Sequence, residues 1–337
     1  MNSFGRLFRV ELFGESHGPA VGAIIDGCPP GLPLSIEDFE TDMARRRAGA
    51  AGTTPRKETD LVSIHSGVHA GYSTGSPIAL SIPNRDTRSV DYDQFRAVPR
   101  PGHADFTSME KYSGYSDPRG SGHFSGRITA GLVAAGVIAK KILPFAEFGT
   151  LVRPGREGRS LDELVAEAVA RDDSVGAIVE IRVRGLPVGL GEPFFDACES
   201  VLAHLLFAVP AVRALEFGDG FAAAGMFGSE HNDPIVDASG RTDKNGAGGI
   251  NGGISNGNEL LLRVAVKPAS SIARAQYSYD FNKETMTELI IEGRHDACIA
   301  LRSAVVLEAA TAIGLADLYL IDRGLYTRGN KNPWRQA

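Results

Sequence analysis

Apolar and polar residues alternate along short segments of the chain, which predicts strands of an antiparallel sheet. The clearest case is residues 178–184, where apolar residues at 179, 181 and 183 alternate with charged residues at 180, 182 and 184. Such a strand is typical of a sheet with one face on the core and the other in water. Two further strands are predicted at 20–26 and 259–266.

Helical periodicity predicts several helices, of which one is buried on all sides. Residues 124–141 are small and apolar nearly all round, which is typical of a helix packed closely against its neighbours. Residues 35–47 begin with a Ser-x-x-Asp capping pattern and end in three arginines, at least one of which we expect to face a cleft. Further helices are predicted at 160–172, 192–207 and 296–316.

These elements predict an α+β fold made of one domain. The chain has no low-complexity linker and no internal repeat, so residues 1–337 form one unit in this interpretation, with 323–337 as a C-terminal tail. Neither the GxGxxG nor the GxxxxGK[ST] pattern occurs, which removes the sequence support for Rossmann and P-loop folds.

Charge and composition narrow the class of protein. The formal net charge of −6 leaves no global basic surface that could hold nucleic acid, so any anion binding must be local. We expect a cytoplasmic protein without membrane segments, because we find no long apolar run and no signal peptide. The three cysteines lack CxxC spacing, so we expect buried thiols rather than disulfides or a metal site.

Glycine is enriched, and the glycines cluster around ionisable residues. The chain has 40 glycines in 337 residues, against about 7% in an average protein. They gather at 14–31, 102–126, 246–257 and 293, and glycine-rich backbone can approach a ligand closely because it has no Cβ. Tight turns would explain any one cluster, but several clusters with ionisable residues favour a ligand site.

Three side chains in these loops are candidates for proton transfer. His17 lies in GESHG (14–18), and a histidine there can act as a general acid near neutral pH. His103 lies in RPGHAD (100–105), where Asp105 could orient the ring or form an Asx-turn. Asp296 lies in GRHD (293–296), where it could be a base or an ordinary helix-start residue.

Arginines and one further loop predict a substrate with several negative charges. Arg46, Arg119, Arg127 and Arg294 lie in or beside glycine-rich segments, and guanidinium groups match phosphate and carboxylate oxygens. The segment KPASS (267–271) suits a phosphate tail, although it could be a plain turn, and GGINGGISNG (248–257) has more turn formers than a hairpin needs. The expected substrate is therefore phosphorylated.

Taken together, these segments resemble one known family. GESHG, PGHAD, SGR (125–127), GGIS-N-G (252–257), KP-x-SS and GRHD, in this order, make the chain similar to chorismate synthases from about Phe4 to Asp322. The resemblance implies a β-α-β sandwich with core helices between antiparallel sheets, assembled as a homotetramer.

The resemblance also implies a reaction. The family is a group of carbon–oxygen lyases that remove phosphate and the C6 hydrogen from 5-enolpyruvylshikimate 3-phosphate to give chorismate, the last step of the shikimate pathway. The reaction needs reduced FMN although it has no net redox change, and NADPH is a possible reductant of the flavin.

Carried over by motif, the resemblance assigns roles to individual residues. His17 would protonate the leaving phosphate, His103 would hold the proton balance of the anionic flavin, and Asp296 would assist removal of the C6 hydrogen together with flavin N5. The substrate contacts implied are Ser16, Arg46 and Arg127. The cofactor contacts implied are His123, Phe124, Ser125, Pro210, Ala211, Gly252, Lys267, Pro268, Ala269, Ser270, Ser271 and Arg294, with Arg46 also placed at NADPH.

Two departures from the family pattern keep other functions open. Many members have arginine and serine where this chain has His123 and Phe124, and an arginine near the position of Gly52; Arg56 and Lys57 could replace the latter. A flavin- or phosphate-binding module without catalysis is one alternative, which three titratable loop residues argue against. A flavin oxidoreductase is another, and it would consume NAD(P)H in step with substrate.

Overall fold

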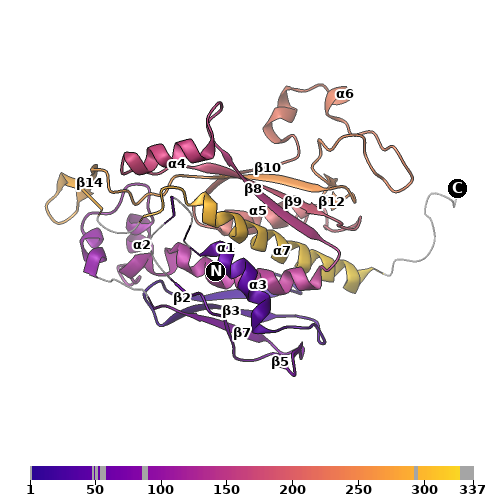
Figure 1. Cartoon of the computed structure of the whole chain (residues 1–337), viewed down its shortest axis with the longest axis horizontal. Coiled ribbons are helices and arrows are strands. Elements are labelled where there is room, and N and C mark those ends of the chain that lie inside the picture. Colours follow the sequence, from indigo (N-terminus) through magenta and orange to yellow (C-terminus); the bar gives the residue numbers. More distant parts are fainter. Residues whose placement is uncertain are drawn as a thin grey trace.

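Two antiparallel sheets enclose a layer of helices in the computed structural model (Figure 1). The model describes residues 2–47, 49, 52–53, 58–85, 90–291 and 295–326. This arrangement confirms the expected α+β sandwich, and the three strands predicted from alternation are present as β3 (Ala20–Asp26), β9 (Ala177–Arg184) and β13 (Leu260–Val266).

The first sheet has five strands and the second has four. All their neighbouring strands pair antiparallel. The first sheet has the order β1 (Ser3–Phe4), β2 (Arg9–Gly14), β3, β7 (Ile78–Pro83), β4 (Ser63–Ile64). The second has the order β10 (Val212–Phe217), β13, β9, β8 (Glu147–Pro154).

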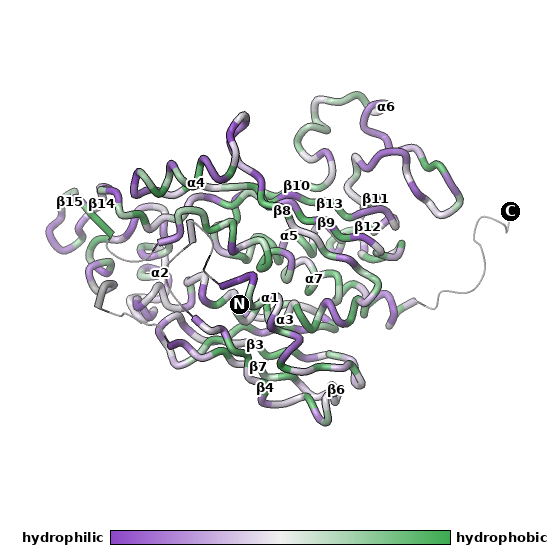
Figure 2. The backbone as a smooth tube through the Cα atoms, in the orientation of Figure 1, coloured by the Kyte–Doolittle hydropathy of each residue, from purple (hydrophilic) through white to green (hydrophobic). Residues whose placement is uncertain are grey.

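The helices α3 (Thr129–Ile142) and α7 (Ala300–Leu325) form the centre of the helical layer. They approach closely where a Cβ on Gly136 would lie 2.4 Å from the Cβ of Ala309. On the opposite side of α3, a Cβ on Gly131 would lie 2.4 Å from the carbonyl oxygen of Gly22 in β3. These distances explain why α3 consists of small apolar residues. Figure 2 shows the hydrophobic colouring of the helical layer between the two sheets.

The other helices surround this centre. The described chain has further helices at η1 (Ile36–Phe39), α1 (Glu40–Arg46), η2 (Val90–Arg96), α2 (Asp105–Lys111), η3 (Arg119–Phe124), η4 (Gly126–Ile128), α4 (Leu161–Ala170), α5 (Cys198–Ala208), η5 (Gly220–Gly225) and α6 (Gly228–His231). Short hairpins pair β5 (Val68–His69) with β6 (Tyr72–Ser73), β11 (Ile250–Asn251) with β12 (Ile254–Ser255), and β14 (Gln276–Asp280) with β15 (Thr285–Leu289).

Two predicted helices have wrong bounds. The helix expected at 192–207 begins at Cys198, because residues 192–196 form a turn closed by a bridge between Glu192 and Asp196. The helix expected at 296–316 begins at Ala300 and continues to Leu325, so the first three residues of the predicted tail 323–337 are helical. The sequence suggested an end before the polar residue Asp317, but that side chain is buried and accepts backbone N–H groups of residues 6–8.

The outer face of β9 is less solvated than its alternation suggested. Glu180 on this face is buried, because the guanidinium groups of Arg153, Arg182 and Arg263 cover it and bond to its carboxylate. The three cysteines are buried free thiols, as expected. By length and hydropathy α7 could cross a bilayer, but 89% of its apolar window is buried inside the molecule, so its composition is accounted for by the core.

Candidate active site

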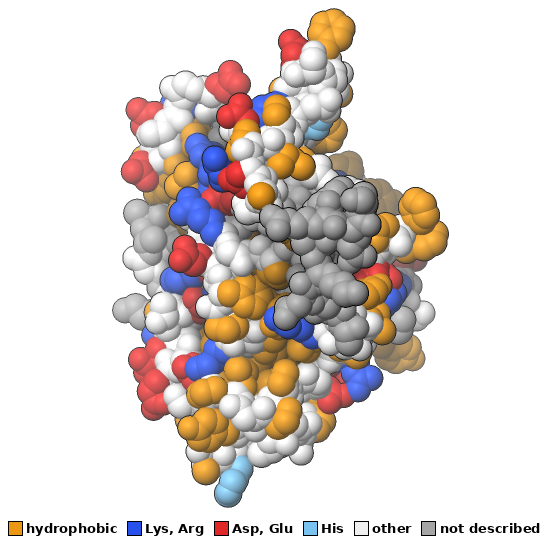
Figure 3. Space-filling model, turned by 90° about the vertical axis from the view of Figure 1, so that its right-hand side faces the viewer, with side chains coloured by type: hydrophobic (Ala, Val, Ile, Leu, Met, Phe, Trp, Pro, Cys, Tyr) orange, Lys and Arg blue, Asp and Glu red, His pale blue; other side chains and the backbone are white. Residues whose placement is uncertain are grey.

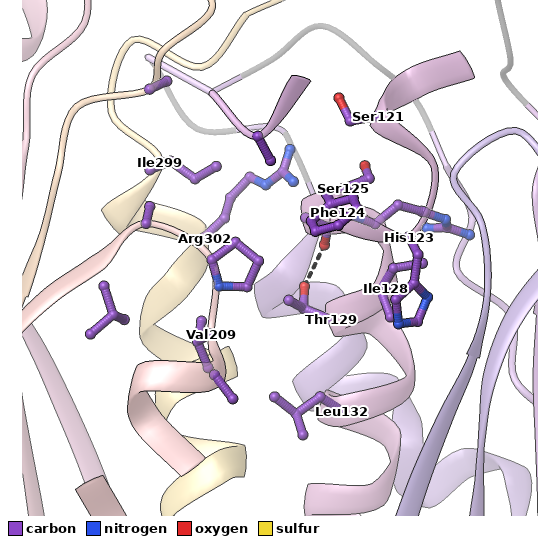
Figure 4. Close-up of a pocket in the computed structure, with 18 of the residues that line it drawn as sticks. Ser121, His123, Phe124, Ser125, Ile128, Thr129, Leu132, Val209, Ile299 and Arg302 are labelled. Carbon is purple, nitrogen blue, oxygen red and sulfur yellow. Dashed lines mark hydrogen bonds between the residues drawn. The ribbon is translucent and has the colours of Figure 1, made fainter. Parts of the chain in front are cut away.

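A cavity of about 820 Å³ brings together most of the residues singled out in the sequence. Its walls come from the turn 119–128 that leads into α3, the end of α5, the loop after β13 and the start of α7 (Figure 4). The predicted site residues that line it are His17, Arg46, His103, His123, Phe124, Ser125, Arg127, Pro210, Ala211, Lys267, Pro268, Ala269, Ser270, Ser271 and Asp296.

One side of the cavity is apolar. Leu132 of α3 and Val209 at the end of α5, both labelled in Figure 4, contribute to it. Leu205 and Ile313 lie deeper and are buried. An apolar wall of this kind suits the flat ring of a cofactor, while another part of the cavity lining is charged.

The charged wall is built around a buried carboxylate between two arginines. Asp60 accepts Nη1 of Arg46 at 3.0 Å through one oxygen, and Nη1 of Arg127 through the other. All three residues are no more than 5% exposed. The remaining nitrogens of both guanidinium groups donate to protein oxygens, including those of Thr129 and Asn84. Two cations and one anion leave a local charge of +1, which attracts an anionic ligand.

Burial and ion pairing act in opposite directions on these groups. Burial tends to raise the pKa of Asp60, but Arg46 and Arg127 hold it below its usual range, so the carboxylate is ionised. Burial lowers the pKa of Arg46 to about 10, which leaves its guanidinium charged at neutral pH. Of the three consecutive arginines, Arg46 and Arg47 line the cavity whereas Arg45 pairs with Glu308 on the far side of α1.

His17 lies in the loop between β2 and β3, where the turn 119–122 packs against it. A Cβ on Gly120 would lie 2.6 Å from His17 Nε2, so glycine at this position lets the backbone reach the ring. On another side the ring meets Tyr92 edge-on, with 5.3 Å between ring centroids. The imidazole is thus held at the cavity wall by packing on two sides.

The prediction that Ser16 contacts substrate is not supported by its position. Ser16 is 1% exposed and is not among the described residues that line the cavity. The reason is local, because the Ser16 N–H donates to the carbonyl of Gly122 at 3.0 Å, which turns the residue toward the loop 119–122.

His103 is held by a carboxylate and an arginine. Its Nδ1 lies 2.8 Å from Asp105, which also accepts Arg100 Nε and Nη2 at 2.7 Å each. Burial alone would raise the pKa of Asp105, but hydrogen bonds from Arg100 and His103 lower it, so it stays ionised. The ionised carboxylate can only accept a hydrogen bond, so Nδ1 carries a hydrogen and donates to Asp105. Nε2 is then the ring nitrogen available for proton exchange. The orienting role considered for Asp105 is the one that this geometry supports.

The KPASS loop is bound to the same segment. Lys267 Nζ and Ser270 Oγ both donate to the carbonyl of Gly102, at 2.5 and 2.8 Å, and Arg100 Nη1 donates to Ser271 Oγ at 3.0 Å. These bonds join two loops that lie more than 160 residues apart in the sequence. A lysine, two hydroxyls and backbone amides thereby lie at one edge of the cavity.

Asp296 lies at the cavity just before α7, together with Arg302 from the first turns of that helix. Arg302 Nη1 is 3.4 Å from Asp296 Oδ1, and Arg302 Nε is buried without a hydrogen-bond partner among the described residues. Figure 4 shows Arg302 beside Ile299 on this wall. The predicted cofactor contact Arg294 lies outside the described residues.

The two departures at the turn before α3 have different consequences. Both ring nitrogens of His123 have protein partners, the carbonyl of Gly14 at 2.9 Å and Asn2 Oδ1 at 3.0 Å. The ring thus joins the N-terminal segment to the cavity wall instead of pointing a free cation at a ligand. Phe124 is 37% exposed and lies near Tyr112, so it adds apolar surface.

Gly252 and Gly52 differ from the expectations in other ways. Gly252 occupies the turn of the β11–β12 hairpin, away from the cavity of the described chain, so the expected flavin contact is not formed within it. Gly52 has φ +81° and a Cβ there would lie 2.3 Å from Val165, so no side chain fits without movement. The residues Arg56 and Lys57 lie outside the described part of the chain.

Among the cavity residues that were missed from the sequence are Asp60, Arg100, Ser121 and Arg302. Arg100 had a signal, because it directly precedes PGHAD. Asp60 had none, since it lies in a polar loop and becomes important through partners 14 and 67 residues away.

Comparisons with known proteins show which family the chain belongs to. The family model described as chorismate synthase matches residues 8–154 and 150–320. A chorismate synthase of Chitinophaga pinensis is 55% identical over 96% of this chain and 98% of its own length, and one of Dehalococcoides mccartyi is 44% identical over 95% and 96%. A crystal structure of a chorismate synthase superposes with a TM-score of 0.73 at 27% identity, over 95% of this chain and 94% of the other. The chain therefore belongs to the chorismate synthase family of lyases, which carries out the last step of the shikimate pathway.

Proposed function

We propose that the cavity binds 5-enolpyruvylshikimate 3-phosphate beside reduced FMN and that the protein releases phosphate to give chorismate. In this reaction the bond between C3 and the phosphate oxygen breaks, the C6 hydrogen is lost and a new carbon–carbon double bond forms. The observation that carries the proposal is that His17, His103 and Asp296, from three loops far apart in the sequence, line one cavity with a cationic wall.

Each of the three residues has a role that its position supports. His17, next to the charged wall, donates a proton to the departing phosphate. His103 exchanges a proton at Nε2 and is oriented by Asp105. Asp296, paired with Arg302, assists removal of the C6 hydrogen. The cluster of Arg46, Asp60 and Arg127 supplies positive potential for the substrate's phosphate and carboxylates.

The residues present fit a flavin mononucleotide. The apolar wall with Leu132 and Val209 suits its ring, and the lysine and hydroxyls of the KPASS loop suit its polar edge. The buried Nε of Arg302 has no described partner, which favours an acceptor atom from a ligand. When bound, the reduced flavin supplies electron density that stabilises an electron-deficient centre in the substrate.

Three further expectations stay proposals. NADPH is a candidate reductant. The Arg46 guanidinium, however, is buried in the charged wall, so its position favours a contribution to the positive charge of the cavity over a direct contact with NADPH. We propose a homotetramer and a cytoplasmic location on the family resemblance. No nucleic acid or membrane partner is proposed.

An anaerobic assay tests the function. The protein is mixed with FMN, dithionite and the enolpyruvyl substrate, and phosphate and chorismate are both measured over time. The proposal predicts equal amounts of the two products with no net consumption of reductant. A parallel assay with NADPH in place of dithionite tests flavin reduction by the protein itself. Protein that binds reduced FMN and yields neither product would contradict the proposal, and NADPH oxidised in step with substrate would favour an oxidoreductase.

A further inference from the structure

Ser121 has a backbone conformation that favours glycine. Its φ is +69° and ψ is 14°, and it lies between Gly120 and Gly122, which also have positive φ. In this region the Cβ of an L-residue crowds the following carbonyl group, so a serine here is strained where glycine would not be. Strained residues that persist at a cavity are candidates for function, provided that their side chains make specific contacts.

The Ser121 hydroxyl makes such contacts with the His103 cluster. Its Oγ accepts Arg100 Nη2 at 2.9 Å and lies 3.4 Å from His103 Nε2. The preceding residue, Gly120, packs directly against His17. The segment Gly120–Gly122 therefore lies between His17 and His103, the two proposed proton-transferring histidines. Its Ser121 side chain is directed to His103. Figure 4 shows Ser121 on this turn, beside Ser125 and Phe124.

The hydrogen-bond pattern lets this hydroxyl serve His103 in both of its protonation states. Asp105 accepts a hydrogen bond from Nδ1–H, so the two protonation states of the ring differ at Nε2. Nε2 is an acceptor with a lone pair in one state and an N–H donor in the other. When Nε2 has a lone pair, the Ser121 O–H can donate to it. When Nε2 carries a hydrogen, the second lone pair of Oγ can accept it, because Arg100 occupies only the first. Neither glycine nor alanine has a group that could do this.

We propose that Ser121 is a positioning residue for His103, which partners Nε2 before and after proton exchange and keeps the ring directed to the cavity. The proposal rests on the proposed function of His103. It accounts for the strained serine at a position where glycine would fit the backbone better, and for the orientation of its hydroxyl toward Arg100 and His103 rather than water.

The test uses three variants of the full-length protein. Ser121→Gly removes the hydroxyl and the strain, whereas Ser121→Ala removes the hydroxyl and keeps the strain. Ser113→Gly is the matched control, because Ser113 also has positive φ, of +53°, but is exposed at the end of α2. For each variant Tm, the Kd of FMN, KM and kcat are measured.

We expect kcat to fall about tenfold in both Ser121 variants, the effect of one hydrogen bond to a proton-transferring group. The Kd of FMN and KM should stay within about twofold of the unaltered protein, and Tm should be unchanged or higher in Ser121→Gly. Ser113→Gly should leave kcat unchanged. If kcat falls in Ser121→Ala but not in Ser121→Gly, strain rather than the hydroxyl is responsible and the proposal is wrong.

A second measurement does not depend on turnover. In ligand-free protein with ¹⁵N-labelled histidine, the His103 Nε2 resonance, assigned by its loss in His103→Asn, should shift in Ser121→Gly and not in Ser113→Gly. An unchanged resonance would contradict the proposal. If the unaltered protein gives no chorismate, the proposed function fails, and this comparison still decides whether Ser121 partners His103.

Discussion

At the scale of single residues, the charged wall depends on one carboxylate. Asp60 separates the guanidinium groups of Arg46 and Arg127, which otherwise would face each other in a buried site. Breaking a buried ion pair by removing one partner is strongly destabilising, because an uncompensated charge is left behind. Asp60 is therefore important for the fold as well as for the net charge offered to a ligand.

Replacing this carboxylate should lower stability. Asp60→Asn leaves two buried cations without their counterion, so we expect the free energy of unfolding to fall by about 3 kcal/mol. Urea unfolding at pH 7 measures it. Asp237→Asn is the control, because Asp237 pairs with Arg241 on an exposed surface, so this substitution should lower stability much less than Asp60→Asn. Equal losses in the two variants would show that Asp60 has no special structural role.

The proposed acid should be separable from flavin binding. His17→Ala removes the proton donor and should lower kcat by about 10² to 10⁴-fold, while the Kd of reduced FMN stays within a factor of about two. Stopped-flow single turnovers and flavin titration measure the two quantities. His69→Ala, at an exposed histidine, should change neither. Similar losses of kcat and of flavin affinity in His17→Ala would point to a structural role.

At the scale of secondary structure, the close approach of α3 and α7 fixes the layer that supports the cavity. The N-terminal ends of both helices line the cavity, so a shift of one helix against the other would move Arg127 relative to Asp296 and Arg302. Small residues at the crossing make the approach possible, and the helix ends are placed by packing remote from the chemistry.

A larger side chain at the contact between α3 and α7 should destabilise the protein, although alanine has a better helix propensity than glycine. Gly136→Ala gains up to about 1 kcal/mol in propensity, but its Cβ would overlap the backbone and Cβ of Ala309, and overpacking costs about 1 to 3 kcal/mol. We expect a lower Tm by calorimetry. Gly314→Ala should be milder, since its Cβ meets the side-chain ends of Leu202 and Leu205, which can move. A higher Tm for Gly136→Ala would contradict this packing argument.

The outer face of the second sheet should make stability sensitive to acid. Burial acts to raise the pKa of Glu180, but Arg153 and Arg182 lower it from 4.5 to about 2. Because the pKa of Glu180 is lower in the folded state than in the unfolded chain, its ionisation stabilises the folded state above pH 4.5. This stabilisation is lost as the pH falls toward 2. The difference in unfolding free energy between the unaltered protein and Glu180→Gln should therefore shrink over that range, as urea titrations at several pH values would show. A constant difference would mean that ionisation of Glu180 does not stabilise the fold.

At the scale of the whole molecule, apolar side chains remain on the surface of the single chain. Residues 218–247 form a lobe that projects from the second sheet (Figure 1), and Phe221 and Phe227 in it are 80% and 79% exposed. Figure 3 shows hydrophobic side chains on the lobe and across the middle of the same face. Exposed patches of this kind are typical of interfaces between subunits.

Assembly should depend on this lobe if the expected homotetramer forms. Light scattering after size-exclusion chromatography should give four times the 35.7 kDa chain mass, and Phe221→Ser with Phe227→Ser should lower the mass with little change in circular dichroism. The same double change made at Tyr277 and Met286, exposed on the β14–β15 hairpin, is the control. A tetramer that survives the lobe substitutions would place the interface elsewhere.

Local pattern by itself determined several of the elements, although not all of their bounds. Alternation identified β9, small apolar residues identified α3 as a buried helix, and the ordered motifs identified the family and part of the cavity lining. These features are local in the sequence, since side-chain period and short spacing follow from the geometry of a single helix, strand or loop.

The tertiary structure decided which groups act together. Asp60 became the counterion of two arginines, and Ser16 became buried against the loop 119–122. Gly252 lies on a hairpin remote from the cavity, and Ser121 contacts His103. Asp317 continued a helix that the sequence suggested would end there, because backbone N–H groups from the N-terminus satisfy it. A buried polar residue is stabilised by partners that lie far along the chain, and no local pattern contains those partners.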